Sequence, residues 1–327
     1  MISRREWLGL SLGAGASIAL TPALLRALQQ SGGALIQRAV PSSGEMLPVI
    51  GLGRGNVSPS ADHAALGEVL RALVDNGGRV LDTVHGNSSA EQVTGTIATE
   101  LGIQNEIFWS SRVFVAHPPM PPGTAAGPPP KADRAAVRAQ VEASLARFRV
   151  PRIDLVQVLA HADLPTHLDV LKELKKEGRV RYIGVTTIAP QYARLEAAMR
   201  DEPIDFVGVD YAVNHRGVEE TILPLALERR IGVLAYFPFG TGRLFRGVGT
   251  TPLPEWAAEF DAKTWGQFFL KYVVSHPAVT VVRTGTSQAT HMLDNLGGGI
   301  GRLPDEATRR RMAELADSWP KAGPAGR

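Results

Sequence analysis

Short apolar runs alternate with amphipathic stretches along most of the chain. The short runs predict buried strands, and the longer stretches with apolar residues three or four positions apart predict helices. The predicted strands cover residues 47–53, 79–83, 106–114, 153–159, 180–186, 204–211, 231–238 and 279–284. The predicted helices cover residues 61–76, 89–101, 135–148, 164–177, 190–200, 218–228 and 264–275, with another from residue 288 and a last one over 304–319. Eight strand–helix units in this order predict an α/β fold, a closed parallel (β/α)8 TIM barrel.

The barrel is expected to be a single domain, because the 327 residues do not divide into two comparable halves. We assign residues 46–320 to it, residues 31–45 to a linker and residues 321–327 to a tail. A proline-rich insert at residues 117–130 follows the third strand, and coil or polyproline II is expected there. In a parallel barrel this insert rises from the end that carries catalytic loops, so a lid and an inert surface loop are both open.

A paired arginine, Arg4-Arg5, precedes a glycine- and alanine-rich apolar run at residues 9–20. This pattern resembles a bacterial twin-arginine export signal, so residues 1–30 are expected to be a signal segment outside the fold. The resemblance implies recognition by the twin-arginine export machinery and a periplasmic or exported location. A typical cleavage motif is absent from a suitable position, so cleavage and an uncleaved N-terminal anchor both remain open.

Composition excludes several classes of function. The formal charge of +3 is small, and the cations are interleaved with acids, which argues against nucleic-acid binding. The chain has no cysteine, which rules out disulfides and thiolate chemistry. Its histidines show no metal-ligand spacing, so no metal is expected. A small molecule is therefore the expected substrate, and the oligomeric state stays open.

Candidate chemistry begins at Asp82, which lies near the end of the second predicted strand and just before a turn. The carboxyl ends of the strands are where α/β barrels hold their catalytic groups. Arg112 lies on the next predicted strand, so we expect it to pair with Asp82 and to remain permanently charged.

Several segments resemble the aldo/keto reductase family. They are residues 47–53, 81–83, 153–157, 177–186, 233–240 and 285–295. The resemblance implies the barrel fold and an oxidoreductase that moves a hydride between a nicotinamide cofactor and a carbonyl or alcohol, with an Asp, a Tyr, a Lys and a His on neighbouring strand ends.

This catalytic tetrad is degenerate here. Asp82 matches the aspartate, and Arg112 stands at the lysine position. The tyrosine position falls on Asn87, or on His85 if the loop is shortened, and the histidine position holds Leu159. The usual tyrosine–lysine mechanism is therefore not expected.

The resemblance also implies NADP(H) or NAD(H) as the cofactor. Tyr236 matches the residue that stacks on the nicotinamide, and Gly208 replaces the usual glutamine beneath its amide. Gln288 replaces the lysine that selects for the 2′-phosphate, so tight NADPH selectivity is not expected. The candidate cofactor-binding residues are Thr186, Tyr236, Gly240, Arg243, Leu244 and Asn295.

The changed residues also suggest chemistry without a hydride. His161 lies two residues beyond Leu159 and so faces the same side of an extended strand. His85 and His161 both titrate near neutral pH and, with Asp82 and Arg112, would form an acid–base cluster. The simpler interpretation is a structural ion pair with exposed loop histidines. Three functions remain open: an oxidoreductase, a non-redox lyase, isomerase or hydrolase, and a catalytically silent ligand-binding protein.

Overall fold

The structure is a computed structural model that describes residues 33–54, 63–83, 88–116 and 129–319. The predicted signal segment, most of the proline-rich insert and the tail lie outside these residues.

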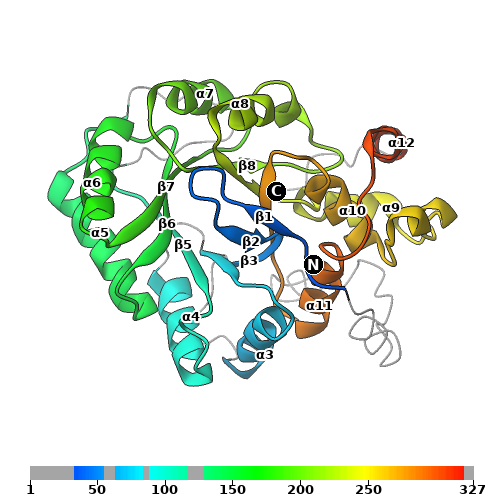
Figure 1. The fold of residues 1–327 in the computed structure, drawn as a ribbon, viewed down its shortest axis with the longest axis horizontal. Coiled ribbons are helices and arrows are strands. Elements are labelled where there is room, and N and C mark those ends of the chain that lie inside the picture. The colour runs from blue at the N-terminus through cyan, green and yellow to red at the C-terminus, as the bar shows by residue number, and fades with distance from the viewer. Residues whose placement is uncertain (1–32, 55–62, 84–87, 117–128, 320–327) are drawn as a thin grey trace, which may run out of the picture.

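The described residues contain a closed barrel of parallel strands that runs in chain order from β3 to β10, with β10 pairing back onto β3 (Figure 1). Its strands are β3 (Ile50–Arg54), β4 (Val80–Thr83), β5 (Phe108–Val113), β6 (Ile153–Leu159), β7 (Val180–Thr186), β8 (Phe206–Asp210), β9 (Gly232–Tyr236) and β10 (Val279–Thr284). The prediction of a (β/α)8 barrel is confirmed.

Helices surround the barrel in the order that the alternation predicts (Figure 1). They are α3 (His63–Val74), α4 (Ser88–Leu101), α5 (Arg134–Phe148), α6 (Leu164–Lys176), α7 (Tyr192–Asp201), α8 (Ile222–Arg229), α9 (Arg243–Val248), α10 (Trp265–Val274), α11 (Ala289–Gly297) and α12 (Glu306–Asp317). Short 3-10 helices precede α8, α9 and α10 at Gly217–Glu219, Gly240–Gly242 and Glu255–Phe260.

Side-chain caps fix where several helices begin. Asp133 accepts a hydrogen bond from the backbone N–H of Ala136 at the start of α5, and Asp305 does the same for Thr308 at the start of α12. Thr264 caps α10 through the N–H of Gln267. Each cap satisfies a backbone donor that the first turn of a helix leaves without a partner.

A two-stranded antiparallel hairpin, β1 (Gln37–Ala39) and β2 (Met46–Pro48), lies across one end of the barrel in Figure 1. The single strand predicted at residues 47–53 is therefore wrong, because its first residues belong to β2 and the rest to β3. The predicted linker likewise contains β1. Strands of three residues are too short for the hydrophobic pattern to reveal.

The hairpin seals the amino-terminal end of the barrel with apolar side chains. Val40 and Leu47 belong to one buried cluster with inward-facing residues of the barrel strands. These are Val80, Phe108, Leu155, Tyr182, Phe206, Leu234, Tyr236 and Val281. Such a layer fills the interior of a small barrel, so this end is a packed core and not a channel.

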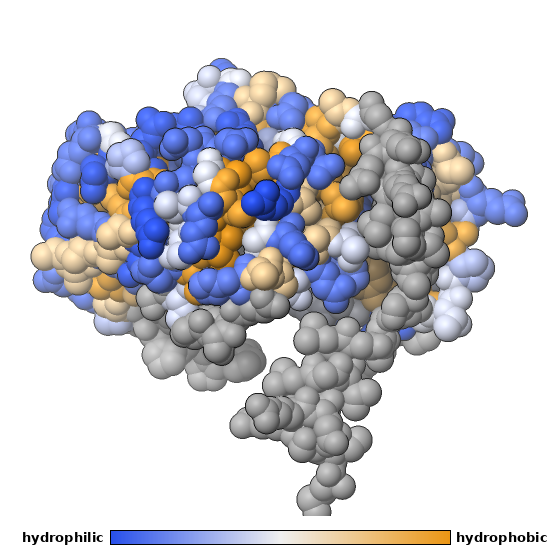
Figure 2. Space-filling model, turned by 90° about the horizontal axis from the view of Figure 1, so that it is seen from below, coloured by the Kyte–Doolittle hydropathy of each residue, from blue (hydrophilic) through white to orange (hydrophobic). Residues whose placement is uncertain are grey.

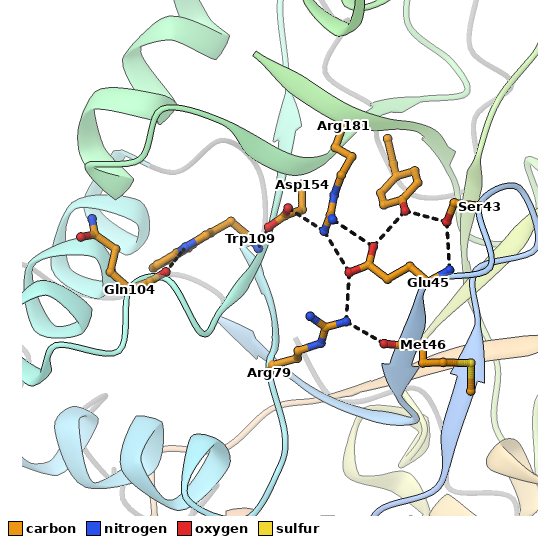
Figure 3. A network of polar contacts seen from close by, with 9 residues as sticks. Ser43, Glu45, Met46, Arg79, Gln104, Trp109, Asp154 and Arg181 are labelled. Carbon is orange, nitrogen blue, oxygen red and sulfur yellow. Dashed lines mark hydrogen bonds and ion pairs between the residues drawn. The ribbon is translucent and has the colours of Figure 1, made fainter. Parts of the chain in front are cut away.

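Glu45, in the hairpin, connects the hairpin to the barrel through polar contacts (Figure 3). Its carboxylate lies 2.9 Å from Arg79 Nη2 and 3.1 Å from Arg181 Nη1, and it accepts a hydrogen bond of 2.8 Å from the Tyr182 hydroxyl. Arg181 also pairs with Asp154 at 2.8 Å. Contacts from one carboxylate to β7 and to the residue just before β4 fix how the hairpin sits on the barrel.

The described residues include no helix that is both long and apolar enough to cross a membrane. On the face shown in Figure 2, hydrophilic side chains dominate, with narrow hydrophobic strips between them.

We predict that Glu45→Ala lowers the free energy of unfolding by about 1–2 kcal/mol, because Arg79, Arg181 and Tyr182 lose their shared acceptor. Urea denaturation followed by circular dichroism measures this change. The matched control is Glu106→Ala, at an exposed position near β5. Equal stability of the two variants would contradict the anchoring role of Glu45.

Candidate functional site at the carboxyl end of the barrel

The inward-facing positions change from apolar to polar toward the carboxyl ends of the strands. Successive side chains of a strand alternate between its two faces, so residues two apart share the inner face. On this rule Asp82 follows Val80, Ser110 follows Phe108, Gln157 follows Leu155, Tyr236 follows Leu234 and Arg283 follows Val281. A polar layer therefore lies next to the apolar layer, toward the carboxyl ends of the strands.

Asp82 is the centre of this polar layer and is fully buried. Its Oδ1 accepts hydrogen bonds from Ser110 Oγ at 2.7 Å and from Gln157 Nε2 at 3.3 Å. Its Oδ2 lies 3.0 Å from Arg112 Nη2 and 2.9 Å from Arg283 Nε. One carboxylate thus faces two guanidinium groups, and their formal charges sum to one excess positive charge.

The two arginines are held differently. Arg112 donates to Asp82 and also, over 2.7 Å, to the backbone oxygen of Thr83. Arg283 reaches Asp82 by crossing Gly53, where a Cβ atom would lie only 2.1 Å from Arg283 Nε. Within the described residues Arg283 Nε is buried without a hydrogen bond. Its contact with Asp82 is therefore an ion pair whose N–H does not point at the carboxylate oxygen well enough to form a hydrogen bond. Arg283 is the more weakly held of the two.

Tyr236 lies inside the polar layer. Its hydroxyl donates to Gln157 Oε1 at 2.7 Å, and its ring fills the space above Gly208, where a Cβ atom would lie 2.2 Å from the hydroxyl. The guanidinium carbons of Arg112 and Arg283 lie 4.8 and 5.4 Å from the ring centroid, within cation–π range. Only 3% of Tyr236 is exposed, so the ring presents almost no surface to a ligand.

The charges in the layer follow from these contacts. Burial acts to lower the pKa of Arg112, but Asp82 and Tyr236 outweigh it and raise that pKa above its ordinary value. Burial, together with the charge of Arg112, lowers the pKa of Arg283 although Asp82 opposes the shift. Burial and the nearby carboxylate raise the pKa of Tyr236. Arg112 is therefore a fixed cation, and Tyr236 is a neutral hydrogen-bond donor.

The structure brings together Asp82, Arg112, Thr186 and Tyr236 from the predicted set. The Thr186 hydroxyl donates to the Gly208 backbone oxygen at 3.1 Å, beside Tyr236. His161 lies just beyond β6 and is 9% exposed. His85 and Asn87, the two residues at the tyrosine position, lie outside the described residues.

The other predicted cofactor residues lie outside this polar layer. Gly240, Thr241 and Gly242 all have positive φ, which forms a tight turn before α9. Arg243 is exposed at the start of that helix, whereas Leu244 is buried. Asn295 is 5% exposed and lies on the buried side of α11 with Met292 and Leu296.

A second polar group, which was not predicted from the sequence, lies at the end of β8. His215 Nε2 lies 2.9 Å from Asp210 Oδ2, and the Tyr192 hydroxyl donates to Asp210 Oδ1 at 2.7 Å. These residues come from a strand end, the loop after it and the start of α7. The sequence feature that could have indicated this group is Asp210, which lies near the end of a predicted strand, as Asp82 does. Among the described residues, no group of three or more histidine and acidic side chains is arranged to hold a metal ion.

Comparison with known proteins gives one consistent family. The sequence model of the Aldo/keto reductase family matches residues 49–312. Aldo-keto reductase YhdN of Bacillus subtilis (strain 168) is 27% identical over 225 residues, which cover 63% of this chain and 61% of that protein. The chain thus spans less than two thirds of that relative's length.

Solved structures share the fold. The holo form of aldo-keto reductase AKR11C1 from Bacillus halodurans matches with a TM-score of 0.68 at 20% identity, over 86% of this chain and 96% of its own. An aldo/keto reductase from Klebsiella pneumoniae in complex with NADP and acetate matches with a TM-score of 0.67 at 22% identity, over 84% and 93% of the two chains.

The described residues suit the phosphate part of a nicotinamide nucleotide but not its nicotinamide ring. The turn at Gly240–Gly242 and the exposed Arg243 suit a phosphate group. Where the nicotinamide ring would stack, the Tyr236 ring is covered by two guanidinium groups, and its hydroxyl donates a hydrogen bond to Gln157. A stacked nicotinamide ring does not fit over Tyr236 in this arrangement.

We predict that Asp82→Asn lowers the free energy of unfolding by about 3–5 kcal/mol, because it leaves two buried guanidiniums without a counter-charge. The measurement is urea denaturation at neutral pH, with the exposed Asp75→Asn on the surface as control. A loss below about 1 kcal/mol would show that Asp82 is not the centre of the polar layer.

Proposed function

This chain belongs to the aldo/keto reductase family, and on that premise we propose that it is an oxidoreductase of small carbonyl or alcohol substrates that uses a nicotinamide nucleotide. The relative from Bacillus subtilis bears the name of an aldo-keto reductase, and the Klebsiella pneumoniae structure is a complex with NADP, which supports the proposal. The nucleotide would supply the hydride, and the chain would supply charge and position.

The observation that carries this proposal is the Asp82–Arg112 ion pair at the carboxyl ends of β4 and β5. The family's aspartate and lysine positions fall on these two residues. Hydride transfer to a carbonyl group leaves negative charge on its oxygen, and a pre-placed cation in a dry site stabilises such charge. Arg112 can provide that charge but no proton, because its pKa is raised. The proton must therefore come from another group.

Arg283 must leave the Tyr236 ring before a nicotinamide can lie there. It is the candidate for movement because it holds Asp82 only through one poorly directed ion pair, whereas Arg112 makes two hydrogen bonds. When Arg283 moves, Arg112 still neutralises Asp82. The polar layer therefore remains paired after the ring has been uncovered.

A second candidate function is favoured by the covered state itself. If Arg283 stays over Tyr236, the excess positive charge is available to an anionic group while hydride chemistry is blocked. The chain would then be a cofactor-independent acid–base enzyme or a ligand-binding protein acting on small oxygenated anions.

We also propose export through the twin-arginine pathway, on the strength of Arg4-Arg5 and the apolar run that follows. We predict that replacing both arginines by lysine removes the full chain from the periplasmic fraction of a bacterial host. Immunoblots of the cell fractions measure this. An unchanged distribution between the fractions would overturn the export proposal.

We predict that Arg283→Leu tightens NADPH binding about 5–30-fold relative to wild type, because it removes the cost of separating Arg283 from Asp82 and Tyr236. Titration followed by NADPH fluorescence or by heat gives the Kd values. Arg310→Leu, on the exposed face of α12, is the control. The absence of saturable binding by wild type and by Arg283→Leu at millimolar NADPH would end the nicotinamide proposal. Equal Kd values would instead remove only the gating role of Arg283.

A further inference from the structure

Asp210, His215 and Tyr192 form a compact polar group at the mouth of the barrel. His215 Nε2 and the Tyr192 hydroxyl both contact the Asp210 carboxylate. In addition, the Tyr192 hydroxyl lies 3.2 Å from His215 Nε2, and the backbone N–H of Ala189 donates to Asp210 Oδ1 at 3.2 Å. Asp210 is thus held by a loop and a helix besides its own strand.

This group adjoins the polar layer around Asp82 but is distinct from it. Along β8, the inward positions are Phe206, then Gly208, then Asp210, so Asp210 lies one step nearer the mouth than the polar layer. In the register of the barrel, Asp210 pairs with Tyr236. The carboxylate therefore lies at the inner rim of the barrel, where the loops of such folds carry catalytic side chains.

The contact with Asp210 determines which nitrogen of His215 is free to react. Because Nε2 donates its proton to the carboxylate in the neutral ring, Nδ1 is left with its lone pair. The His215 side chain is 42% exposed, which permits a ligand to approach. A carboxylate that orients a histidine while its other nitrogen acts as a base is the arrangement of hydrolytic triads.

Two exposed apolar side chains follow the strands on either side of β8. Ile188 follows β7 and is 49% exposed, and Phe237 follows β9 and is 43% exposed. Because β8 lies between β7 and β9, these side chains stand on either side of the Asp210 strand. Phe237 is held at a φ of 52°, in the left-handed region that bulky residues avoid. Exposed apolar groups beside a polar pair are typical of a binding site for a partly apolar small molecule.

We propose that Asp210, His215 and Tyr192 form an acid–base site that removes and returns a proton on the carbon next to a carbonyl group, in compounds whose apolar part lies between Ile188 and Phe237. The proposal goes beyond the oxidoreductase function, because this step needs no nucleotide. Asp210 and Tyr192 are positioning residues, and His215 is the catalytic residue.

The step is a proton transfer in both directions. The Nδ1 lone pair takes the proton, the electrons of the broken C–H bond form the carbon–carbon double bond of an enolate, and the carbonyl π electrons move to the oxygen. In reverse, the enolate carbon takes a proton from Nδ1–H and the carbonyl group returns. In D2O the proton on Nδ1 exchanges with solvent, so deuterium enters the compound.

Among the residues that the structure describes, the charged and titratable groups that interact with His215 are Asp210 on β8, Tyr192 on α7 and Arg243 on α9. The hydrogen bond to Asp210 raises the pKa of His215 above its ordinary value of 6.5, against burial and the charge of Arg243, which lower it. Only the neutral ring is a base, so the exchange rate should increase with pH through this raised pKa. Asp210→Asn should move the midpoint to lower pH, which a purely structural role would not do.

The test uses phenylacetone, a ketone with an apolar ring, and follows deuterium entry into its methylene group by proton NMR without nucleotide. Wild type should accelerate exchange over buffer, and His215→Gln should lower the catalysed rate about 100-fold. His291→Gln, at an exposed position on α11, is the control and should match wild type.

Either of two results would overturn the proposal: wild-type exchange no faster than buffer, or an undiminished rate in His215→Gln. Should His215→Gln fail to fold, the titration of the His215 ring in the wild-type protein by NMR decides. A midpoint above 6.5 that shifts on addition of phenylacetone supports the site, and a midpoint unaffected by phenylacetone refutes it.

Discussion

A fully buried carboxylate must be paired, and in this barrel Asp82 is paired twice. Arg112 approaches it from the next strand and Arg283 from the last strand of the barrel, so the ion pairs span the seam where β10 meets β3. Removal of one arginine leaves a neutral pair, whereas removal of the aspartate leaves two like charges. The arrangement of Tyr236, Gln157 and Ser110 follows from this centre, since each is linked to Asp82 directly or through one partner.

The two ends of the barrel differ in how their interior is filled. The amino-terminal end is closed by an apolar layer and by a hairpin held through Glu45. Toward the opposite end, the Asp82 layer lies inside the barrel and the Asp210–His215 pair lies at the rim. Two centres of different character therefore lie toward this end of the barrel: a fixed positive charge at Arg112, and the titratable ring of His215.

The sequence predicts the fold well because each strand and helix is encoded locally, by short apolar runs and by caps such as Asp133 and Thr264. The hairpin escapes prediction because its strands are short and its anchor, Glu45, meets Arg181 from a distant part of the chain. The Asp82–Arg112 pair follows from adjacent strands. The roles of Arg283 and Tyr236 do not, since they depend on how side chains cross the closed barrel over Gly53 and Gly208. The group around His215 could not be predicted, because Tyr192 on α7 and Asp210 on β8 are distant in sequence and meet only in the folded chain.

Arg283 lies over the Tyr236 ring and beside Asp82, and the proposed nicotinamide function requires it to move from the ring when a nucleotide binds. Paired crystal structures, of the purified protein alone and after soaking with NADP⁺, test this most directly. We expect the guanidinium of Arg283 beside Asp82 and over the Tyr236 ring in the first structure, and a displaced Arg283 with Arg112 still on Asp82 in the second. An Arg283 that points away from Asp82 in the nucleotide-free crystal would contradict it.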